Sequence, residues 1–241
     1  MLTHAPVVQD PSRLGALRRI GVLDSPAEEC FDRLTRIAAA GLQAPVSLIS
    51  LVDEDRQFFK SCLGLPEPWA SERETPLTHS ICQHVVAARE PLVVVDAREH
   101  ALLRDNLAIR DLGVVAYAGV PLITSAGVEI GALCVIDREP RAWAAGEVAL
   151  LRDLAATAVT LIETRADLRG RNASDGALLA RIRAGDDEAL GELYDRHAGV
   201  LYAVAHAVVE DEEAAEDAVA DALFRAAREA PPAIRSGEVR A

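Results

Sequence analysis

Side chains that could do chemistry gather in one short segment, residues 79–84, which reads His-Ser-Ile-Cys-Gln-His. A thiol beside imidazoles can hold a metal ion or a haem iron. His79 and His84, however, are five residues apart, whereas neighbours on one face of a helix are three or four apart. We therefore interpret the segment as ordinary packing and expect no metal site there.

The chain has four cysteines, Cys30, Cys62, Cys82 and Cys134, and no Cys-x-x-Cys pair. In a reducing compartment such thiols are expected to be small buried hydrophobes rather than disulfides or zinc ligands. The nearest pair in sequence, Cys62 and Cys82, is separated by 20 residues and has no cluster of cations to lower a thiol pKa. Thiol redox chemistry at Cys82 or Cys134, as an enzyme or a sensor, stays open as an alternative.

Motifs for other reactions are missing. The sequence shows no Ser-His-Asp set, no phosphate-binding glycine loop and no HExxH, the patterns by which hydrolases, nucleotide-binding proteins and zinc proteases are identified. We therefore expect a protein that is not an enzyme.

The charge of the chain argues against nucleic acid as a direct partner. The net charge is −13 and Lys60 is the only lysine, whereas a protein that binds nucleic acid by itself needs clustered cations. No apolar run reaches the roughly 18 residues of a membrane span, and the start MLTHAPVVQD lacks the features of a signal peptide. We expect a cytoplasmic protein with no membrane partner.

Two helix starts precede the first strands. Asp10 is followed by proline, and Ser25 stands before Pro26 with Glu28 three residues further on, which has the form of a capping box. The helix after it carries an apolar stripe that predicts packing on a core. The stripe consists of Phe31, Leu34, Ile37, Ala38 and Leu42.

Strand patterns dominate the next stretch. VSLISLVD and QFFKSCLG predict one hairpin, and VVAYAGVPLIT with VEIGALCVID predicts a second. A short helix THSICQHVVAARE and the strand LVVVD lie between them, and a long helix is expected over residues 144–168. The sum is an α+β fold, an antiparallel sheet flanked by helices.

These motifs, in this order, resemble a GAF domain of the small bacterial sensory type over residues 14–168. The resemblance implies a six-stranded antiparallel sheet, a pocket on one face for a small regulatory ligand, and often dimers formed through the flanking helices. We expect a mixture of aromatic, thiol, imidazole and amide groups to line the pocket. The candidates are Phe58, His79, Cys82, His84, Asn106, Tyr117 and Cys134.

The resemblance does not name the ligand. Photoreceptor GAF domains bond a bilin to a cysteine two residues before a histidine, as Cys82 stands before His84, but the surrounding chromophore motifs are missing. The Asn-Lys-x-Phe-Asp-Glu signature of cyclic-nucleotide GAF domains is also missing, and GAF-fold methionine sulfoxide reductases use closely placed cysteines. We therefore do not expect bilin, haem or cyclic GMP, and the ligand stays unknown.

Residues 169–176, RGRNASDG, predict a linker, and residues 177–230 predict helices. This helical segment resembles the first part of region 2 of extracytoplasmic-function sigma-70 factors. The resemblance implies that the helix of residues 216–228 docks on the RNA polymerase β′ subunit or binds an anti-sigma protein. Asp217, Asp221 and Arg225 are the candidate contacts.

The segment also departs from that family. Ala220-Asp221 stands where Gln-Glu is usual, Ala227 replaces a tryptophan, and the DNA-melting part and region 4 do not follow. The leading interpretation is a ligand sensor coupled to an incomplete sigma region 2. The alternative is a relic, or an acidic hairpin that only solubilises or dimerises the chain.

Overall fold

The computed structural model describes residues 7–184, 186–209 and 211–229. The chain divides into two compact units, Met1–Ala166 and Asp167–Ala241, and each is described by itself. The division falls within one long helix, α6 (Ala145–Arg183).

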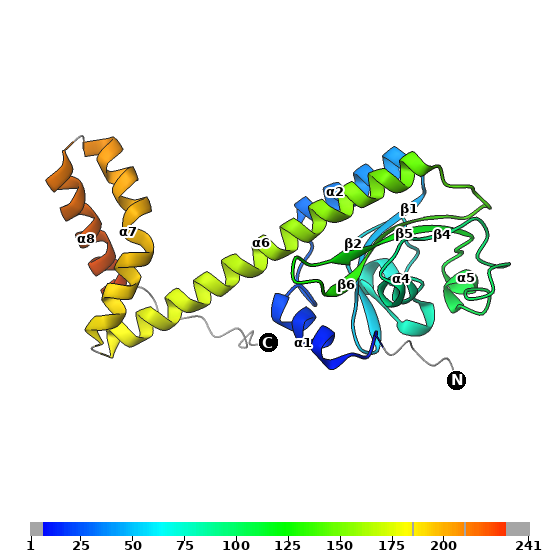
Figure 1. Cartoon of the computed structure of the whole chain (residues 1–241), viewed down its shortest axis with the longest axis horizontal. Helices are drawn as coiled ribbons and strands as arrows, with labels where there is room; N and C mark the ends of the chain where they lie inside the picture. The colour runs from blue at the N-terminus through cyan, green and yellow to red at the C-terminus, as the bar shows by residue number, and fades with distance from the viewer. Residues whose placement is uncertain (1–6, 185, 210, 230–241) are drawn as a thin grey trace. The chain divides into compact units, whose positions relative to one another are not determined.

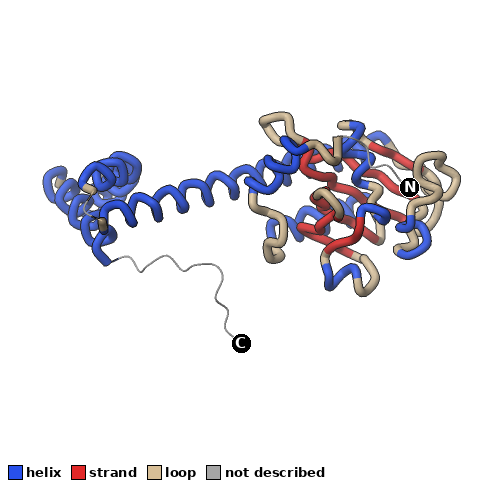
Figure 2. The backbone as a smooth tube through the Cα atoms, turned by 90° about the horizontal axis from the view of Figure 1, so that it is seen from below, coloured by secondary structure: helices blue, strands red, loops and turns tan. Residues whose placement is uncertain are grey.

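The first unit is built on one six-stranded sheet, in the order β3-β2-β1-β6-β5-β4. Every neighbouring pair of strands is antiparallel, and Figure 2 shows the strands in red. The predicted α+β fold and both predicted hairpins are confirmed, while the short strand β3 was not predicted. The strands are β1 (Val46–Val52), β2 (Arg56–Leu63), β3 (Glu74–Pro76), β4 (Leu92–Val94), β5 (Ala116–Ile123) and β6 (Glu129–Asp137).

Helices cover both faces of this sheet (Figure 1). The helices α1 (Pro11–Ile20) and α2 (Glu29–Leu42) and the first part of α6 pack on one face. The other face is covered by short elements, and each of its helices is too short to be stable without the sheet. These are α3 (Trp69–Glu72), a 3₁₀ turn (Leu77–His79), α4 (Cys82–Ala88) and α5 (Leu107–Asp111).

The alternation of strand residues divides the core into two layers. On β6, Leu133 and Val135 pack in the layer of α2 and α6, whereas Ala132, Cys134 and Ile136 pack in the layer of α4. Successive side chains of a strand point to opposite faces, so β6 is buried on both. The thiol of Cys134 therefore belongs to the α4 layer.

A β-bulge interrupts the alternation on β2. Ser50 pairs with Phe59 and Ile49 pairs with Ser61, which leaves Lys60 as the extra residue. A bulge changes which face the following side chains reach. The chain's only lysine faces the α2 layer, as Phe58 does, and its side chain is 0% exposed. The bulge brings Ser61 to the same layer, where it bonds with Thr35 and Asp32.

One of the two predicted helix starts is confirmed. Asp10 caps α1, since its carboxylate accepts a hydrogen bond of 2.8 Å from the backbone nitrogen of Arg13. The capping box at Ser25 and Glu28 is wrong, because α2 begins at Glu29 and no side chain caps it. Both side chains instead bind the ammonium of Lys60.

The second unit is helical. It contains the last part of α6, then α7 (Asp187–Val209) and α8 (Glu212–Glu229), which pack around a small apolar core. The helix predicted to end near residue 168 is longer than expected, because residues 169–176, for which we expected a linker, are helical. None of the helices in the described part of the chain combines the length and the hydrophobicity that a membrane span requires.

Candidate functional site

A small cavity lies between the sheet and the α4 layer of the first unit. The space that the centre of a water molecule can reach is about 20 Å³, and roughly 10–15 Å³ of such space holds one water. Its polar walls are His79, Cys82, Tyr117 and Cys134, and the other walls are mostly aliphatic. The cavity admits a molecule about the size of water, whereas sites for drug-sized ligands measure roughly 300–1,000 Å³.

The two thiols and the phenol meet in this cavity. The Sγ atom of Cys82 lies 3.8 Å from the Sγ atom of Cys134 and 3.3 Å from the hydroxyl of Tyr117. All three side chains belong to residues that are at most 2% exposed. The expectation of buried thiols is therefore right for Cys82 and Cys134, but Cys30 is exposed and Cys62 is half-buried.

Gly119 has no side chain and so leaves room for the hydroxyl of Tyr117. A Cβ atom at Gly119 would lie 2.2 Å from the hydroxyl and 2.6 Å from the Cζ atom of Tyr117. Gly119 also pairs with Cys134 across β5 and β6. A glycine at this position therefore provides the space in which the phenol reaches the thiols.

Hydrogen bonding and burial act in opposite directions on this group. Hydrogen bonding with Cys134, and then with Tyr117, lowers the pKa of the Cys82 thiol against the opposing effect of burial. The hydrogen bond to Cys82 raises the pKa of Cys134, and burial adds to this rise. Burial also raises the pKa of Tyr117. The hydrogen bonds from Cys134 and Tyr117 therefore favour the thiolate form of Cys82.

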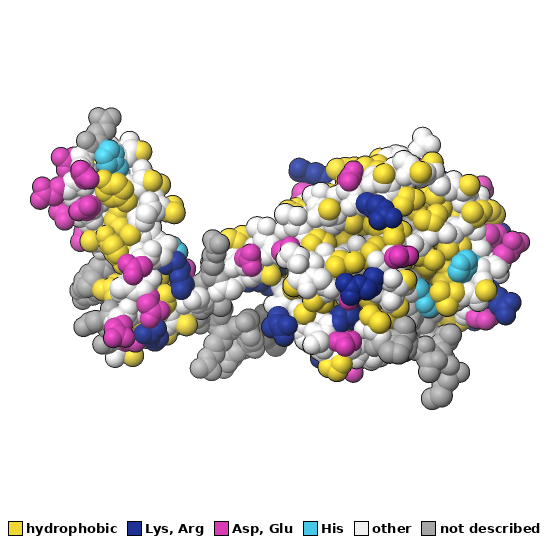
Figure 3. Space-filling view, viewed as in Figure 1, with side chains coloured by type: hydrophobic (Ala, Val, Ile, Leu, Met, Phe, Trp, Pro, Cys, Tyr) yellow, Lys and Arg dark blue, Asp and Glu magenta, His cyan; other side chains and the backbone are white. Residues whose placement is uncertain are grey.

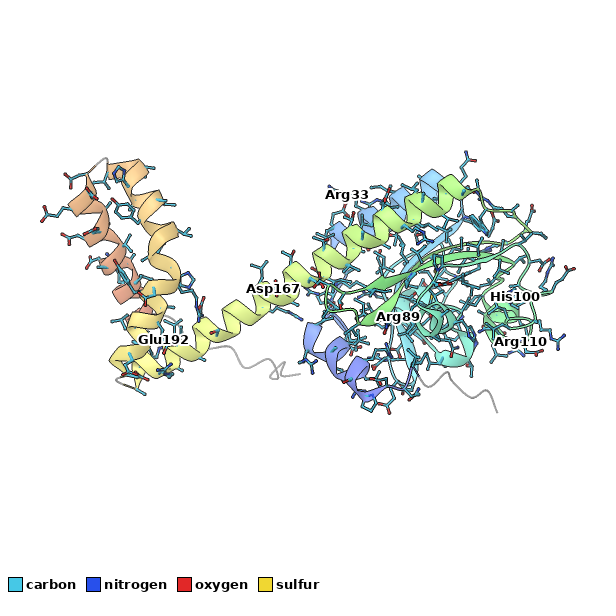
Figure 4. All side chains as sticks on the ribbon, viewed as in Figure 1. Arg33, Arg89, His100, Arg110, Asp167 and Glu192 are labelled. Carbon is cyan, nitrogen blue, oxygen red and sulfur yellow. The ribbon has the colours of Figure 1, made fainter. Side chains whose placement is uncertain are left out.

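His79 forms the rim of the cavity together with α5. Its Nε2 atom lies 3.0 Å from a carboxylate oxygen of Asp111, and its ring packs against Trp69 with 5.2 Å between centroids. Arg110, labelled in Figure 4, donates to the same carboxylate. Arg110 first, and His79 second, hold the pKa of Asp111 well below its ordinary value.

The structure separates three of the predicted pocket residues from this cavity. Phe58 packs in the α2 layer on the opposite face of the sheet, and its neighbour Phe59 lines the cavity instead. His84 lies on α4 but is not among the lining residues. Asn106 caps α5 and donates to the carbonyl of Ser80, so its role is to hold the rim.

Proximity of the thiols was the main feature that the sequence did not reveal. Cys82 and Cys134 are 52 residues apart in sequence, and spacing alone gave no reason to pair them. The argument that this chain lacks closely placed cysteines is therefore wrong. Within the described residues, no group of three or more His, Cys, Asp or Glu side chains could hold a metal ion.

A second polar cluster is buried on the opposite face of the sheet. The ammonium of Lys60 donates to Ser25 Oγ and the carbonyl of Pro26, each at 2.8 Å, and pairs with Glu28. Glu28 also receives Arg165 of α6 at 2.9 Å. Every polar group here has a partner, so we interpret the cluster as structural.

Comparisons with known proteins agree with this architecture. The family model described as GAF domain matches residues 26–162. The GAF domains of phosphoenolpyruvate-protein phosphotransferases from Acinetobacter and from Coxiella burnetii each superpose with a TM-score of 0.50, at 19% and 20% identity. Each comparison covers 67% of this chain, and 99% and 96% of those chains respectively. At this identity they show the fold alone.

One curated relative overturns an expectation. A Pseudomonas aeruginosa protein named cyclic di-GMP phosphodiesterase is 34% identical over 183 residues, which are 74% of this chain and 30% of that protein. Its name is that of an enzyme, so the expectation of a protein that is not an enzyme is contradicted. That expectation rested on the absence of known catalytic motifs. Such an absence excludes only the kinds of enzyme that those motifs identify. The matched family model, the six-stranded sheet and its two helical layers together show that this chain belongs to the GAF domain family.

Proposed function

We propose that this chain is a cytoplasmic signalling protein whose GAF domain senses a small ligand in the α4 layer. The observation that carries the proposal is the cavity itself, where imidazole, phenol and thiol groups converge between the sheet and α4. Sites for small ligands combine apolar walls with a few convergent polar groups in this way.

The size of the cavity determines how a larger ligand would enter. With about 20 Å³ open to a water molecule, the walls must move apart before a metabolite can bind. The elements free to move are the short ones, α4, α5 and the 3₁₀ turn, because β1, β5 and β6 are paired on both edges. We infer that ligand binding opens the α4 layer and leaves the sheet in place.

A thermal-shift screen of the purified full chain tests this proposal. The probes are amino acids, organic acids and nucleotides, with cyclic di-GMP among them because the Pseudomonas relative is named for it. A ligand present at 100 times its dissociation constant stabilises the folded state by about 2.7 kcal/mol. For a protein of this size the melting temperature then rises by roughly 5–10 °C.

Filling the cavity provides the control. Ala108 lines it and is 1% exposed, so Ala108→Leu should remove the shift produced by a hit. Ala40→Leu adds the same atoms to the exposed surface of α2 and should leave the shift unchanged. A shift that persists in Ala108→Leu would place the ligand elsewhere, and a screen in which no probe acts would speak against the sensor.

A second candidate function concerns the helical unit. We propose that its helices bind another protein, with the RNA polymerase β′ subunit or an anti-sigma protein as the partner that the sigma resemblance suggests. α7 exposes Val200, Val204 and Val208, at 62–78% exposure and four-residue spacing, so they share one helical face. Hydrophobic side chains are visible on the surface of this unit in Figure 3. An exposed apolar stripe favours a protein contact over a purely solubilising role.

The candidate contacts Asp217, Asp221 and Arg225 lie on α8, where Arg225 pairs with Asp221 at 3.2 Å. Asp217 and Asp221 border a shallow hollow whose other walls are Ala214, Ala218 and Ala220. Small residues beside two carboxylates suit the approach of basic side chains.

Co-purification of polymerase and anti-sigma proteins with the full chain tests this function. Asp217→Ala with Asp221→Ala should reduce recovery if the acidic hollow is used, and Val204→Asp should reduce it if the valine stripe is used. Equal recovery with wild type and with both variants would leave the helical unit without this role.

A further inference from the structure

The cavity holds a pair of thiols that a ligand sensor does not require. Cys82 and Cys134 face each other at 3.8 Å across the packing of α4 on β6. The other polar groups around them are the imidazole of His79 and the hydroxyls of Tyr117 and Ser50. Within the described residues, Ser50 Oγ is buried and has no hydrogen-bond partner.

We propose that Cys82 and Cys134 form a peroxide-responsive dithiol, which a small hydroperoxide entering the cavity oxidises to a disulfide. This inference goes beyond the ligand-sensing function and does not depend on it. Disulfides in reducing compartments are usually transient and serve redox sensing or catalysis.

The size of the cavity limits which oxidant can reach the two thiols. Hydrogen peroxide is little larger than water and suits about 20 Å³ of accessible space, whereas a bulky organic hydroperoxide or a protein disulfide does not. The expected substrate is therefore hydrogen peroxide.

The first step takes place at Cys82. The Cys82 thiolate attacks one oxygen of the peroxide, an S–O bond forms and the O–O bond breaks. The second oxygen leaves as hydroxide and takes the proton that the Cys82 thiol released, which gives one water. The hydroxyl of Tyr117, 3.3 Å from the sulfur, donates a hydrogen bond to the thiolate before the attack.

The second step joins the sulfurs. The sulfur of Cys134 attacks the Cys82 sulfenic sulfur, the S–S bond forms, and the S–O bond breaks. The hydroxyl leaves with the Cys134 proton as a second water. Two thiols have then lost two electrons to one peroxide. The sulfurs must approach from 3.8 Å to about 2.05 Å, which draws α4 closer to β6.

Peptide mass mapping of the full chain tests the proposal. The reduced protein is exposed to a small molar excess of hydrogen peroxide, quenched with an alkylating reagent in denaturant and digested. We expect an intramolecular Cys82–Cys134 linkage that dithiothreitol reverses. The variant Cys30→Ser with Cys62→Ser keeps only the proposed pair and should form the same linkage. Unmodified Cys82 and Cys134, in a sample where exposed Cys30 is oxidised, would overturn the proposal.

Single variants test the order of the steps. Cys134→Ser should stop at a Cys82 sulfenic acid that dimedone traps, and Cys82→Ser should give no trapped species at Cys134. Tyr117→Phe removes only the donor hydroxyl and should slow the reaction about tenfold, since a hydrogen bond to a charged group contributes on the order of tenfold or more. Equal trapping at Cys134 in Cys82→Ser would overturn the assignment of Cys82 as the attacking thiol.

Discussion

Lys60 shows how one residue can stabilise an entire layer. Its buried ammonium binds Ser25 and Pro26 of the segment before α2 and pairs with Glu28, which Arg165 of α6 also reaches. Burial lowers the pKa of Lys60, and the bonds to Glu28 oppose that shift. The lysine is therefore retained as a charged group only because its partners surround it.

Replacing Lys60 should destabilise the first unit. Lys60→Met keeps the apolar stem but leaves the Pro26 carbonyl without its donor and Ser25 and Glu28 with Arg165 alone, and we expect a loss of about 2 kcal/mol in the free energy of unfolding. Lys60→Ala adds a cavity and should cost about 1–2 kcal/mol more. Urea unfolding followed by tryptophan fluorescence measures both, because the chain's two tryptophans, Trp69 and Trp143, lie in this unit.

An exposed ion pair on α2 provides the matched control. Arg36 pairs with Glu29 at 2.5 Å, with side chains 49% and 64% exposed, so Arg36→Met should cost less than about 1 kcal/mol. Similar losses for Arg36→Met and Lys60→Met would contradict the role given to the buried lysine.

The rim of the cavity makes a prediction about pH. Asp111 has a folded-state pKa below its unfolded value of about 3.9, so its contribution to stability is complete above about pH 4 and is lost as the pH falls below it. Because Arg110 is the largest cause, Arg110→Ala should raise the pKa of Asp111 toward the unfolded value. A carboxyl NMR titration measures this shift. Arg104→Ala removes an exposed arginine paired with Asp105 instead and should leave the Asp111 titration unchanged.

At the scale of elements, α1 is attached to the sheet by one buried arginine. Arg13 is 4% exposed, and its guanidinium donates to the carbonyls of Val52, Glu129 and Val8 at 2.7–3.1 Å. The first two carbonyls belong to the end of β1 and the start of β6. The guanidinium of Arg13 therefore connects α1 with β1 and β6.

Replacing Arg13 should destabilise α1 more than it destabilises the sheet. Arg13→Met leaves buried carbonyls without donors, and we expect a cost of about 3 kcal/mol. Arg13→Lys should recover only part of it, because an ammonium lacks the planar fork. Hydrogen exchange measured by mass spectrometry should show faster exchange of α1 amides and unchanged exchange in β5. Arg19→Met, on the exposed side of α1, is the control, and slower or unaltered α1 exchange in Arg13→Met would refute the attachment.

Elements with a clear hydrophobic period could be predicted from the sequence, but features that depend on irregular pairing could not. Both hairpins, α2 and the cap at Asp10 were found because their signals are local. The bulge at Lys60 is a property of the pairing between β1 and β2, so strand alternation could not predict that Lys60 and Ser61 face the same layer. Alternation puts Phe58 and Phe59 on opposite faces but does not say which face holds the cavity. The three residues of β3 are too few to show a period.

At the scale of the whole molecule, the sequence located the pocket residues only in part. His79, Cys82, Tyr117 and Cys134 were singled out by chemical type, and the structure brings them together. Their proximity arises from packing α4 on β6, a contact between segments far apart in the chain. The type of each side chain can be seen in the sequence, whereas the distance between the two thiols depends on the fold. The pairing of Cys82 with Cys134 could therefore not have been predicted.

The two units differ in how much apolar surface they bury, and this should make them unfold separately. The first unit has two extensive clusters of buried side chains. The described residues of the second unit contribute a cluster with five buried members, Leu178, Ala189, Leu193, Val219 and Leu223. A small core supplies only a few kcal/mol, so the helical unit should melt at the lower temperature. Far-ultraviolet circular dichroism should then change before tryptophan fluorescence does.

Leu193→Ala tests this separation, because the leucine is 4% exposed within the small core. Loss of a buried leucine typically costs 2–5 kcal/mol, which is comparable to the whole stability expected of such a unit. The variant should therefore lose the first transition seen by circular dichroism and keep the fluorescence midpoint of wild type. Val200→Ala, at a position 72% exposed, should leave both transitions unaltered. A different result would be coincident midpoints by the two methods in wild type, both shifted by Leu193→Ala. The helical unit and the GAF domain would then unfold as one cooperative body, because a local loss reaches distant tryptophans only when the stability is shared.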